Sequence, residues 1–192
     1  MNEIKLDWQG PVDFSKINDE DYTSKWNVKD FEKAGIYIHC FKIPNQDKLA
    51  IAYVGKNENS IKGRNIEHIK NTGKGIYSLY GFNEADFLDI IYNQNDFKYF
   101  DDFKNDVEKN IQEMKLFYAN CNAKDIYDFA SLRPLEGAIQ FHLYKKSYTR
   151  KYLTTNVCSY SLRNTKIIND KSGLDTDLEI VGLDDEMITY QD

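Results

Sequence analysis

Two apolar segments joined by a short polar turn constrain the fold of this chain more than any other feature. The first covers residues 35–43, is rich in β-branched and aromatic side chains, and ends at the turn-forming sequence Pro44-Asn45-Gln46-Asp47. The second covers residues 49–54. Two such segments with a short polar link are typical of an antiparallel β-hairpin. We therefore expect a hairpin over residues 35–54.

A helix is predicted directly after this hairpin. Ser60 can cap its N-terminus, Gly73 follows it as a C-terminal stop, and isoleucines at helical spacing form its apolar stripe. Arg64 and His68 are four residues apart, so they share a face at the edge of that stripe. Side chains in this position line a cleft beside a packed sheet.

The remaining elements are predicted from shorter patterns. We expect a third strand at residues 75–80, a helix after the capping residue Asn83, a longer helix from residue 102 to 118 and a helix with Pro134 in its first turn. Residues 178–181 are a short strand candidate. The predicted class is α/β, with a small, mainly antiparallel three-stranded sheet flanked by helices, helical insertions and irregular termini.

The length of 192 residues favours one domain with extensions. We predict an N-terminal extension over residues 1–33, a central domain over 34–156 with a helical insertion at about 83–118, and an acidic C-terminal extension over 157–192.

Negative charge is concentrated in the C-terminal segment. The whole chain has a net charge of −6, yet residues 170–192 alone hold eight acidic residues and one lysine, which leaves residues 1–169 at +1. The acidic total argues against a nucleic-acid partner, but this distribution removes the objection for most of the chain. Segments 56–74 and 142–166 are locally basic. The acidic tail can equally be a solvated surface.

The cysteines and the N-terminus favour a cytoplasmic protein. Cys40, Cys121 and Cys158 are odd in number and far apart, which suits free thiols in a reducing compartment. They have no zinc-ligand spacing with the three histidines. The start of the chain lacks the pattern of a signal peptide, and no apolar run approaches the ~20 residues that span a bilayer. We expect no membrane partner and no organic cofactor.

An ordered set of motifs between residues 35 and 68 points to a chemistry. It consists of Gly35-Ile36-Tyr37, Tyr53-Val54-Gly55-Lys56, Arg64 and His68. This set resembles the GIY-YIG nuclease superfamily, in which the first two motifs lie on neighbouring strands and the arginine and histidine lie on the following helix. A lone GIY carries little weight, because Gly75-Ile76-Tyr77 repeats it without a partner motif.

The resemblance also implies a metal-binding glutamate on a later helix, usually followed by an asparagine. Glu136 fits the E-x-x-I helix pattern of such a glutamate, and Asn156 is the best downstream asparagine. Glu108 and Glu113 are competitors, but they lie in an acidic amphipathic helix without that pattern. The resemblance thus implies one Mg²⁺ or Mn²⁺ ion held by Glu136.

These residue types suit phosphodiester hydrolysis. The Arg64 guanidinium would stabilise charge on the phosphate oxygens. Tyr37, Tyr53 or His68 would position or deprotonate the attacking water, and the sequence leaves open which one does so. Lys56 would contact the phosphate or lower the pKa of a tyrosine.

Three further residues are expected to serve structure rather than chemistry. Gly55 would satisfy backbone geometry within the second motif. His39 and His142 are expected to be structural histidines.

The function that we predict is a metal-dependent DNA endonuclease of restriction-like or mobile-element type, with a homodimer expected for cutting both strands. Contacts to DNA are predicted for Lys56, Arg64, Asn156 and three residues of the basic segment, Lys145, Lys146 and Arg150. Two alternatives stay open: a non-catalytic nucleic-acid-binding or interaction protein, and a structure-specific or RNA nuclease with the same site.

Overall fold

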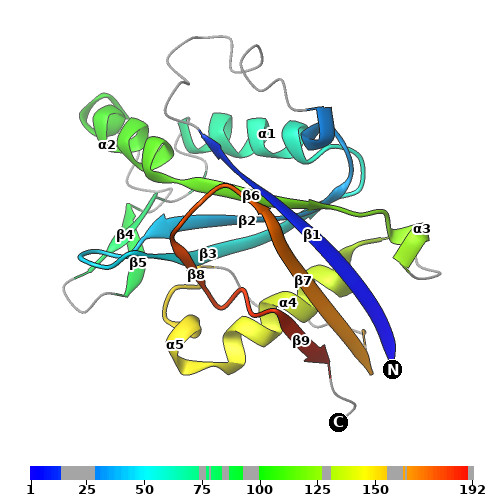
Figure 1. The fold of residues 1–192 in the computed structure, drawn as a ribbon. Helices are drawn as coiled ribbons and strands as arrows, with labels where there is room; N and C mark the ends of the chain where they lie inside the picture. Colours follow the sequence, from blue (N-terminus) through cyan, green and yellow to red (C-terminus); the bar gives the residue numbers. More distant parts are fainter. Residues whose placement is uncertain are drawn as a thin grey trace.

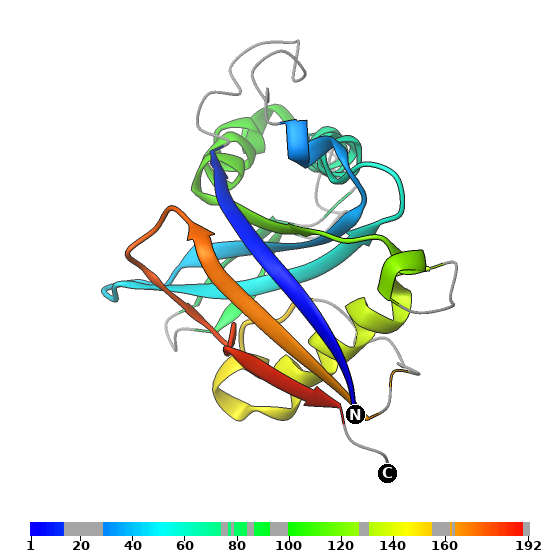
Figure 2. The same cartoon turned by 45° about the vertical axis from the view of Figure 1, so that its right-hand side comes forward.

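A strongly curled, half-barrel β-sheet dominates the structure, with helices packed against both of its faces (Figures 1 and 2). The computed structural model describes residues 1–13, 29–73, 77, 79–83, 87–92, 100–126, 131–154, 162 and 164–189. All structural statements below concern these residues.

The main sheet has seven strands within the described residues, and it is mixed. Their order across the sheet is β8 (Glu179–Val181), β3 (Lys48–Asn57), β2 (Gly35–Lys42), β6 (Lys115–Asn120), β1 (Asn2–Asp13), β7 (Thr165–Leu174) and β9 (Glu186–Thr189). The β3–β8 and β1–β7 pairs are parallel, and the other pairs are antiparallel. A second, two-stranded antiparallel sheet consists of β4 (Leu79–Phe82) and β5 (Leu88–Tyr92).

Helices cover both faces of the main sheet. One face packs against α1 (Ile61–Gly73), with α2 (Phe100–Glu113) beside it, and the other against α4 (Arg133–Lys145), followed by α5 (Ser147–Arg150) (Figure 1). Two short pieces complete the described helices, the 3₁₀-helix η1 (Lys29–Glu32) and α3 (Ala123–Ile126). None of the described helices has the length and apolar character needed to cross a membrane.

The hairpin, the helix after it and the helix with Pro134 are confirmed. β2 pairs antiparallel with β3, with Tyr37 opposite Gly55. α1 begins after Ser60, whose hydroxyl accepts a hydrogen bond of 3.0 Å from the backbone N–H of Gly63. Pro134 lies in the first turn of α4, and the short C-terminal strand is β8.

The prediction of a small, mainly antiparallel three-stranded sheet is wrong. Both ends of the chain, expected to be irregular, supply strands of the main sheet: β1 from the N-terminus and β7, β8 and β9 from the C-terminus. In β1 the apolar side chains of Ile4, Leu6 and Trp8 are buried and alternate with exposed polar ones. This period of two is typical of a strand, and the high polarity of the segment conceals it.

A hydrogen bond between two buried side chains joins β1, near the N-terminus, to β7, near the C-terminus. The Trp8 indole Nε1 donates to the Asn169 side-chain oxygen at 2.8 Å, and both side chains are buried. These residues lie 161 positions apart in the sequence. The predicted domain limits at residues 34 and 156 stay predictions.

The prediction of a mainly helical insertion at 83–118 also needs correction. Asn83 closes a turn instead of capping a helix, because its backbone N–H donates to the Phe87 carbonyl and its side chain accepts from the Phe87 N–H. β5 follows this turn. The third strand expected at 75–80 shares only residues 79 and 80 with β4, which belongs to the small sheet. The longer helix is α2, which ends at Glu113 before β6 begins.

Candidate active site

Beyond residue 50, one edge of β3 has no neighbouring strand among the described residues, and the candidate site lies at this edge. β8 pairs only with residues 48–50 of β3. Further along, the Ala52 carbonyl accepts a hydrogen bond from the Thr154 N–H at 2.9 Å, and the Val54 carbonyl accepts one from the Gln140 side chain at 3.1 Å. Side chains from α1 on one face and from α4 on the other can therefore meet around this edge.

Tyr37, Tyr53 and His68 form one aromatic cluster on the α1 face. The Tyr37 hydroxyl and His68 Nε2 are 3.1 Å apart, and the Tyr53 and His68 ring centroids are 5.3 Å apart. Tyr37 is fully buried, and burial raises the pKa of its hydroxyl far above the usual range. Burial also raises the pKa of Tyr53, although its hydrogen bond with Tyr37 opposes the shift. Both tyrosines are therefore protonated at neutral pH.

Gly55 makes room for this cluster. A Cβ at this position would lie within 3.0 Å of both the Tyr37 and the Tyr53 rings. The two rings thus pack directly over the backbone of β3. Gly55 serves packing, and its role depends on the close approach of these rings rather than on an unusual backbone angle.

His39 packs against the rings of Tyr37 and Tyr53 in this cluster. Its ring stacks on Tyr53 at 5.2 Å, and its Nε2 is 2.6 Å from the Asn65 side-chain oxygen. Asn65 is itself fixed by a hydrogen bond to the Ile61 carbonyl at 2.9 Å. Burial lowers the pKa of His39 to about 4, so the ring is neutral and holds Tyr53 in place.

Arg64 lies one turn before His68 on α1. Its Nη1 donates to the Glu67 carboxylate at 2.5 Å, and it interacts electrostatically with Tyr37 and Tyr77. Partial burial lowers the pKa of Arg64, but Glu67 and the two tyrosines outweigh it and raise the pKa overall. The Glu67 carboxylate is mostly exposed, and an exposed ion pair of this kind is weak. A phosphate can therefore displace Glu67 from Arg64.

Lys56 is held at the end of β3 by Glu58. Its Nζ lies 2.7 Å from Glu58 Oε1, and the same oxygen accepts hydrogen bonds from the Ser131 hydroxyl at 3.0 Å and the Leu132 N–H at 2.8 Å. Burial opposes ionisation of Glu58, but these hydrogen bonds prevail and lower its pKa. Glu58 thus ties the end of β3 to the segment that begins α4.

Glu136 lies in the first turn of α4, and its carboxylate has no hydrogen bond or salt bridge to any described residue. Burial raises its pKa, while the positive charges of Lys56, Arg133 and Arg64 act in the opposite direction. It also interacts with Tyr53 across the open edge of β3. A half-buried, unpaired carboxylate is costly, and a hydrated divalent cation would compensate it.

The donor set fits a single ion with few protein ligands. The described residues contain no group of three His, Cys, Asp or Glu side chains placed to hold a metal. Magnesium is commonly bound by one or two carboxylates with several waters retained. Glu136 satisfies that requirement, whereas the Glu58 carboxylate is already engaged by Lys56.

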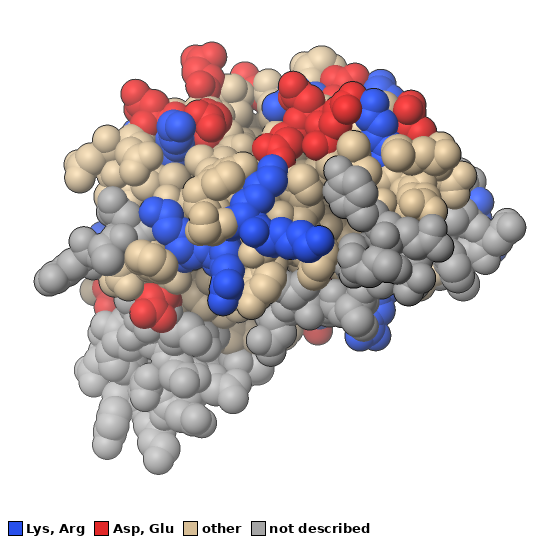
Figure 3. Space-filling model, turned by 90° about the horizontal axis from the view of Figure 1, so that it is seen from below, with Lys and Arg blue, Asp and Glu red and all other residues tan. Residues whose placement is uncertain are grey.

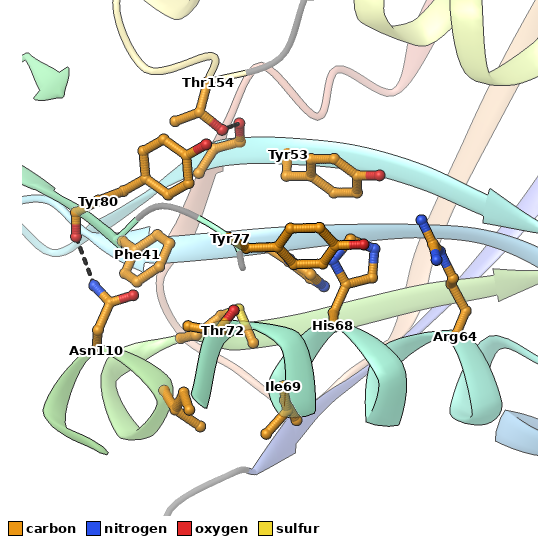
Figure 4. Close-up of a pocket in the computed structure, with 14 residues that line it drawn as sticks. Phe41, Tyr53, Arg64, His68, Ile69, Thr72, Tyr77, Tyr80, Asn110 and Thr154 are labelled. Carbon is orange, nitrogen blue, oxygen red and sulfur yellow. Dashed lines mark hydrogen bonds between the residues drawn. The ribbon is translucent and has the colours of Figure 1, made fainter. Parts of the chain in front are cut away.

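A cavity of about 340 Å³ opens beside the cluster (Figure 4). It lies between β3, α1, β4 and α2, and its lining includes His68 together with Tyr53 and Arg64, which both interact electrostatically with Glu136. Figure 4 shows the Tyr53 hydroxyl and the Arg64 guanidinium at the same end of this cavity. Tyr77 also lines it, with its ring 5.1 Å from the His68 ring.

The structure brings together all six residues predicted as catalytic, which are Tyr37, Tyr53, Lys56, Arg64, His68 and Glu136. Three of the residues predicted to bind nucleic acid lie elsewhere, at the far end of α4 and on α5: Lys145, Lys146 and Arg150. Asn156 lies outside the described residues.

Sequence reasoning missed four residues that shape the site. Glu58, Asn65 and Gln140 act through long-range hydrogen bonds, and their positions carry no local signal. Tyr77 did have a local sequence signal, since it belongs to the second GIY tripeptide, but that tripeptide has no partner motif and carries little weight by itself.

Comparison with known proteins adds no relative. A scan against models of protein families finds no match, and neither curated proteins nor solved structures include one that matches. The GIY-YIG resemblance stays a prediction.

Exchange of Gly55 for alanine tests the packing of the tyrosines. We expect Gly55→Ala to lower the free energy of unfolding by about 1–3 kcal/mol, because the new methyl group must displace two buried rings. Gly63→Ala is the matched control, since Gly63 is exposed on α1 and a Cβ there meets nothing closer than 3.5 Å. It should gain about 0.5–1 kcal/mol in urea unfolding. Equal stability of the two variants would contradict this packing.

The pH dependence of stability tests the burial of His68. Burial lowers its pKa to about 3, against about 6.5 in an unfolded chain. Between these values the unfolded state binds a proton that the folded state does not, so stability falls as the pH falls from 6.5. Urea unfolding should show that His68→Gln loses about 2 kcal/mol less than the wild type between pH 7 and pH 5. An equal loss in both proteins would contradict a buried neutral His68.

Proposed function

We propose that this protein is a metal-dependent endonuclease that hydrolyses phosphodiester bonds in DNA. The observation that carries the proposal is the unpaired Glu136 carboxylate, which shares the open edge of β3 with Arg64 and Tyr53. A carboxylate, a guanidinium and a hydroxyl in this arrangement provide what phosphodiester hydrolysis needs: a cation site, a phosphate site and a water site.

Arg64 binds the scissile phosphate in this proposal. Its forked donors match two non-bridging phosphate oxygens, and their negative charge grows in the transition state. Glu67 holds the guanidinium until the phosphate replaces it. Lys56 adds a second positive charge at the end of β3, in a position fixed by Glu58.

Tyr53 and His68 are the candidates for handling the attacking water. Tyr37 is fully buried, so its hydroxyl is placed to orient His68 rather than to contact water. His68 is neutral because burial lowers its pKa, so its imidazole can hydrogen-bond to the water and orient it. Tyr53 reaches the same space from β3 and would orient the water by hydrogen bonding.

Glu136 would hold a Mg²⁺ or Mn²⁺ ion, which when bound would neutralise phosphate charge and stabilise the leaving oxygen. Partial burial favours this role, because the low-polarity surroundings strengthen the attraction between the carboxylate and a cation. Each chain carries one such site, so we propose a homodimer, or two successive nicks, for a double-strand cut.

Plasmid cleavage tests this proposal. Wild-type protein should cut supercoiled DNA in the presence of Mg²⁺ or Mn²⁺, and a chelator should abolish cutting. We expect Glu136→Gln and Arg64→Ala each to lower the rate on the order of 10²-fold or more, because each removes a charge that the transition state requires. Glu113→Gln on α2 is the control, since this exposed carboxylate does not line the cavity and its loss should leave the rate unchanged.

The same assay separates the alternatives. Cutting that survives Glu136→Gln would contradict the assigned carboxylate. Branched DNA and RNA, tested in parallel, would reveal a structure-specific enzyme or a ribonuclease if either is cut in preference to duplex DNA. Failure to cut any substrate, by protein with a normal unfolding transition, would contradict the enzyme and favour a nucleic-acid-binding protein.

A further inference from the structure

A second charged hollow lies at the far end of α4 from the candidate active site. It has a volume of about 520 Å³ and is lined by Phe87, Lys145, Ser147, Arg150 and Lys151, which we call the α5 hollow. Lysines and arginines gather on this face of the molecule (Figure 3). No acidic side chain is found among the described residues that line it.

The cations that line the hollow form no ion pair with a described carboxylate, although Lys145 also lines a neighbouring hollow that contains Asp184 and Glu186. Residues 137–169 contain six lysines and arginines and no aspartate or glutamate, in a chain whose net charge is −6. Among the described residues, Lys145, Arg150 and Lys151 have no acidic partner. Lys146 is not one of these free cations, because its ammonium forms an ion pair with the Asp184 carboxylate.

Two exposed aromatic rings lie at this hollow: Phe87 lines it, and Tyr144 packs against Arg150, which lines it. Phe87 and Tyr144 are 47% and 41% exposed, whereas Tyr148, which is 51% exposed, lines a different hollow rich in carboxylates. Cations lie against these rings: the Arg150 guanidinium is 4.5 Å from the Tyr144 centroid, and Lys151 Nζ is 5.6 Å from that of Phe87. An exposed ring with a cation beside it can stack a further ring on its open face.

We propose that the α5 hollow binds an unpaired stretch of a nucleic-acid strand, which stacks bases on Tyr144 and Phe87 and places phosphates against Lys145, Arg150 and Lys151. This inference rests on the proposed nuclease function and narrows its substrate to one with a single-stranded segment. Bases in a duplex offer no free face to a protein ring, so exposed aromatics beside cations favour unpaired bases. A surface built only for duplex phosphates would need the cations but not the rings.

The distance between the two sites suits such a substrate. Glu136 and Lys145 are nine residues apart on one helix, which corresponds to about 14 Å along its axis. Nine residues are also about two and a half turns, which places the two residues on opposite sides of α4. A nucleic acid that occupies both sites therefore has its scissile phosphate at the open edge of β3 and passes round α4 to place a flanking single strand in the α5 hollow.

Fluorescence anisotropy with a labelled thymidine oligonucleotide tests the proposal. The full chain carrying Glu136→Gln should bind the single strand more tightly than a duplex of equal length. Tyr144→Ala should weaken binding at least about fivefold, because stacking of one base is lost. Tyr144→Phe should retain it, since the ring remains, and Lys109→Gln on α2 is the charge control. Tyr144 and Lys109 are exposed, so their variants should fold.

Three results would overturn the proposal. These are equal binding of single strand and duplex, binding of the Tyr144→Ala variant equal to that of its parent, and binding only to vesicles of phosphatidylserine and phosphatidylcholine, which would assign the patch to a membrane surface. The outcome is separate from that of the plasmid assay. Plasmid cutting by a protein whose Tyr144→Ala variant binds normally contradicts only this inference, whereas stacking-dependent binding without any cutting contradicts only the nuclease.

Discussion

One carboxylate oxygen joins the two halves of the candidate active site. Glu58 Oε1 accepts hydrogen bonds from Lys56 at the end of β3 and from Ser131 and Leu132 just before α4. The first turn of α4 contains Glu136, so this contact sets where the unpaired carboxylate lies relative to the sheet. On the other face, the packing of tyrosine rings over Gly55 fixes the position of α1 and its charged side chains.

The open edge of β3 is what makes this arrangement possible. If another strand continued along β3, the faces carrying α1 and α4 would be separated by sheet. Instead β8 stops pairing after Ala50, and the next two outward carbonyls accept hydrogen bonds from the Thr154 N–H and the Gln140 side chain. Residues from both faces, Arg64 on one and Glu136 on the other, then come within electrostatic reach. Partial burial makes their charges interact more strongly than they would in water.

The sequence predicted well what local patterns specify, and poorly what long-range pairing specifies. The hairpin, α1 and α4 follow from periodicity and capping residues, and the six predicted catalytic residues lie on these elements or at their ends. The pairing of β1 with β7 joins segments some 160 residues apart, and no local pattern announces it. The same holds for Glu58, whose partners lie 73 and 74 residues further along the chain. An asparagine side chain can accept a backbone N–H either at a helix N-terminus or in a turn. Asn83 accepts one in a turn, so the helix predicted after it is absent from the described residues there.

The most direct test of the central claim is a crystal structure of the protein soaked with Mn²⁺, read from the anomalous signal of the metal. The account predicts one peak beside the Glu136 carboxylate, within reach of the space between Tyr53 and Arg64, with Glu58 still bonded to Lys56. A manganese ion bound elsewhere, or no ion beside a well-ordered and still unpaired Glu136, would contradict a metal-dependent site at the open edge of β3.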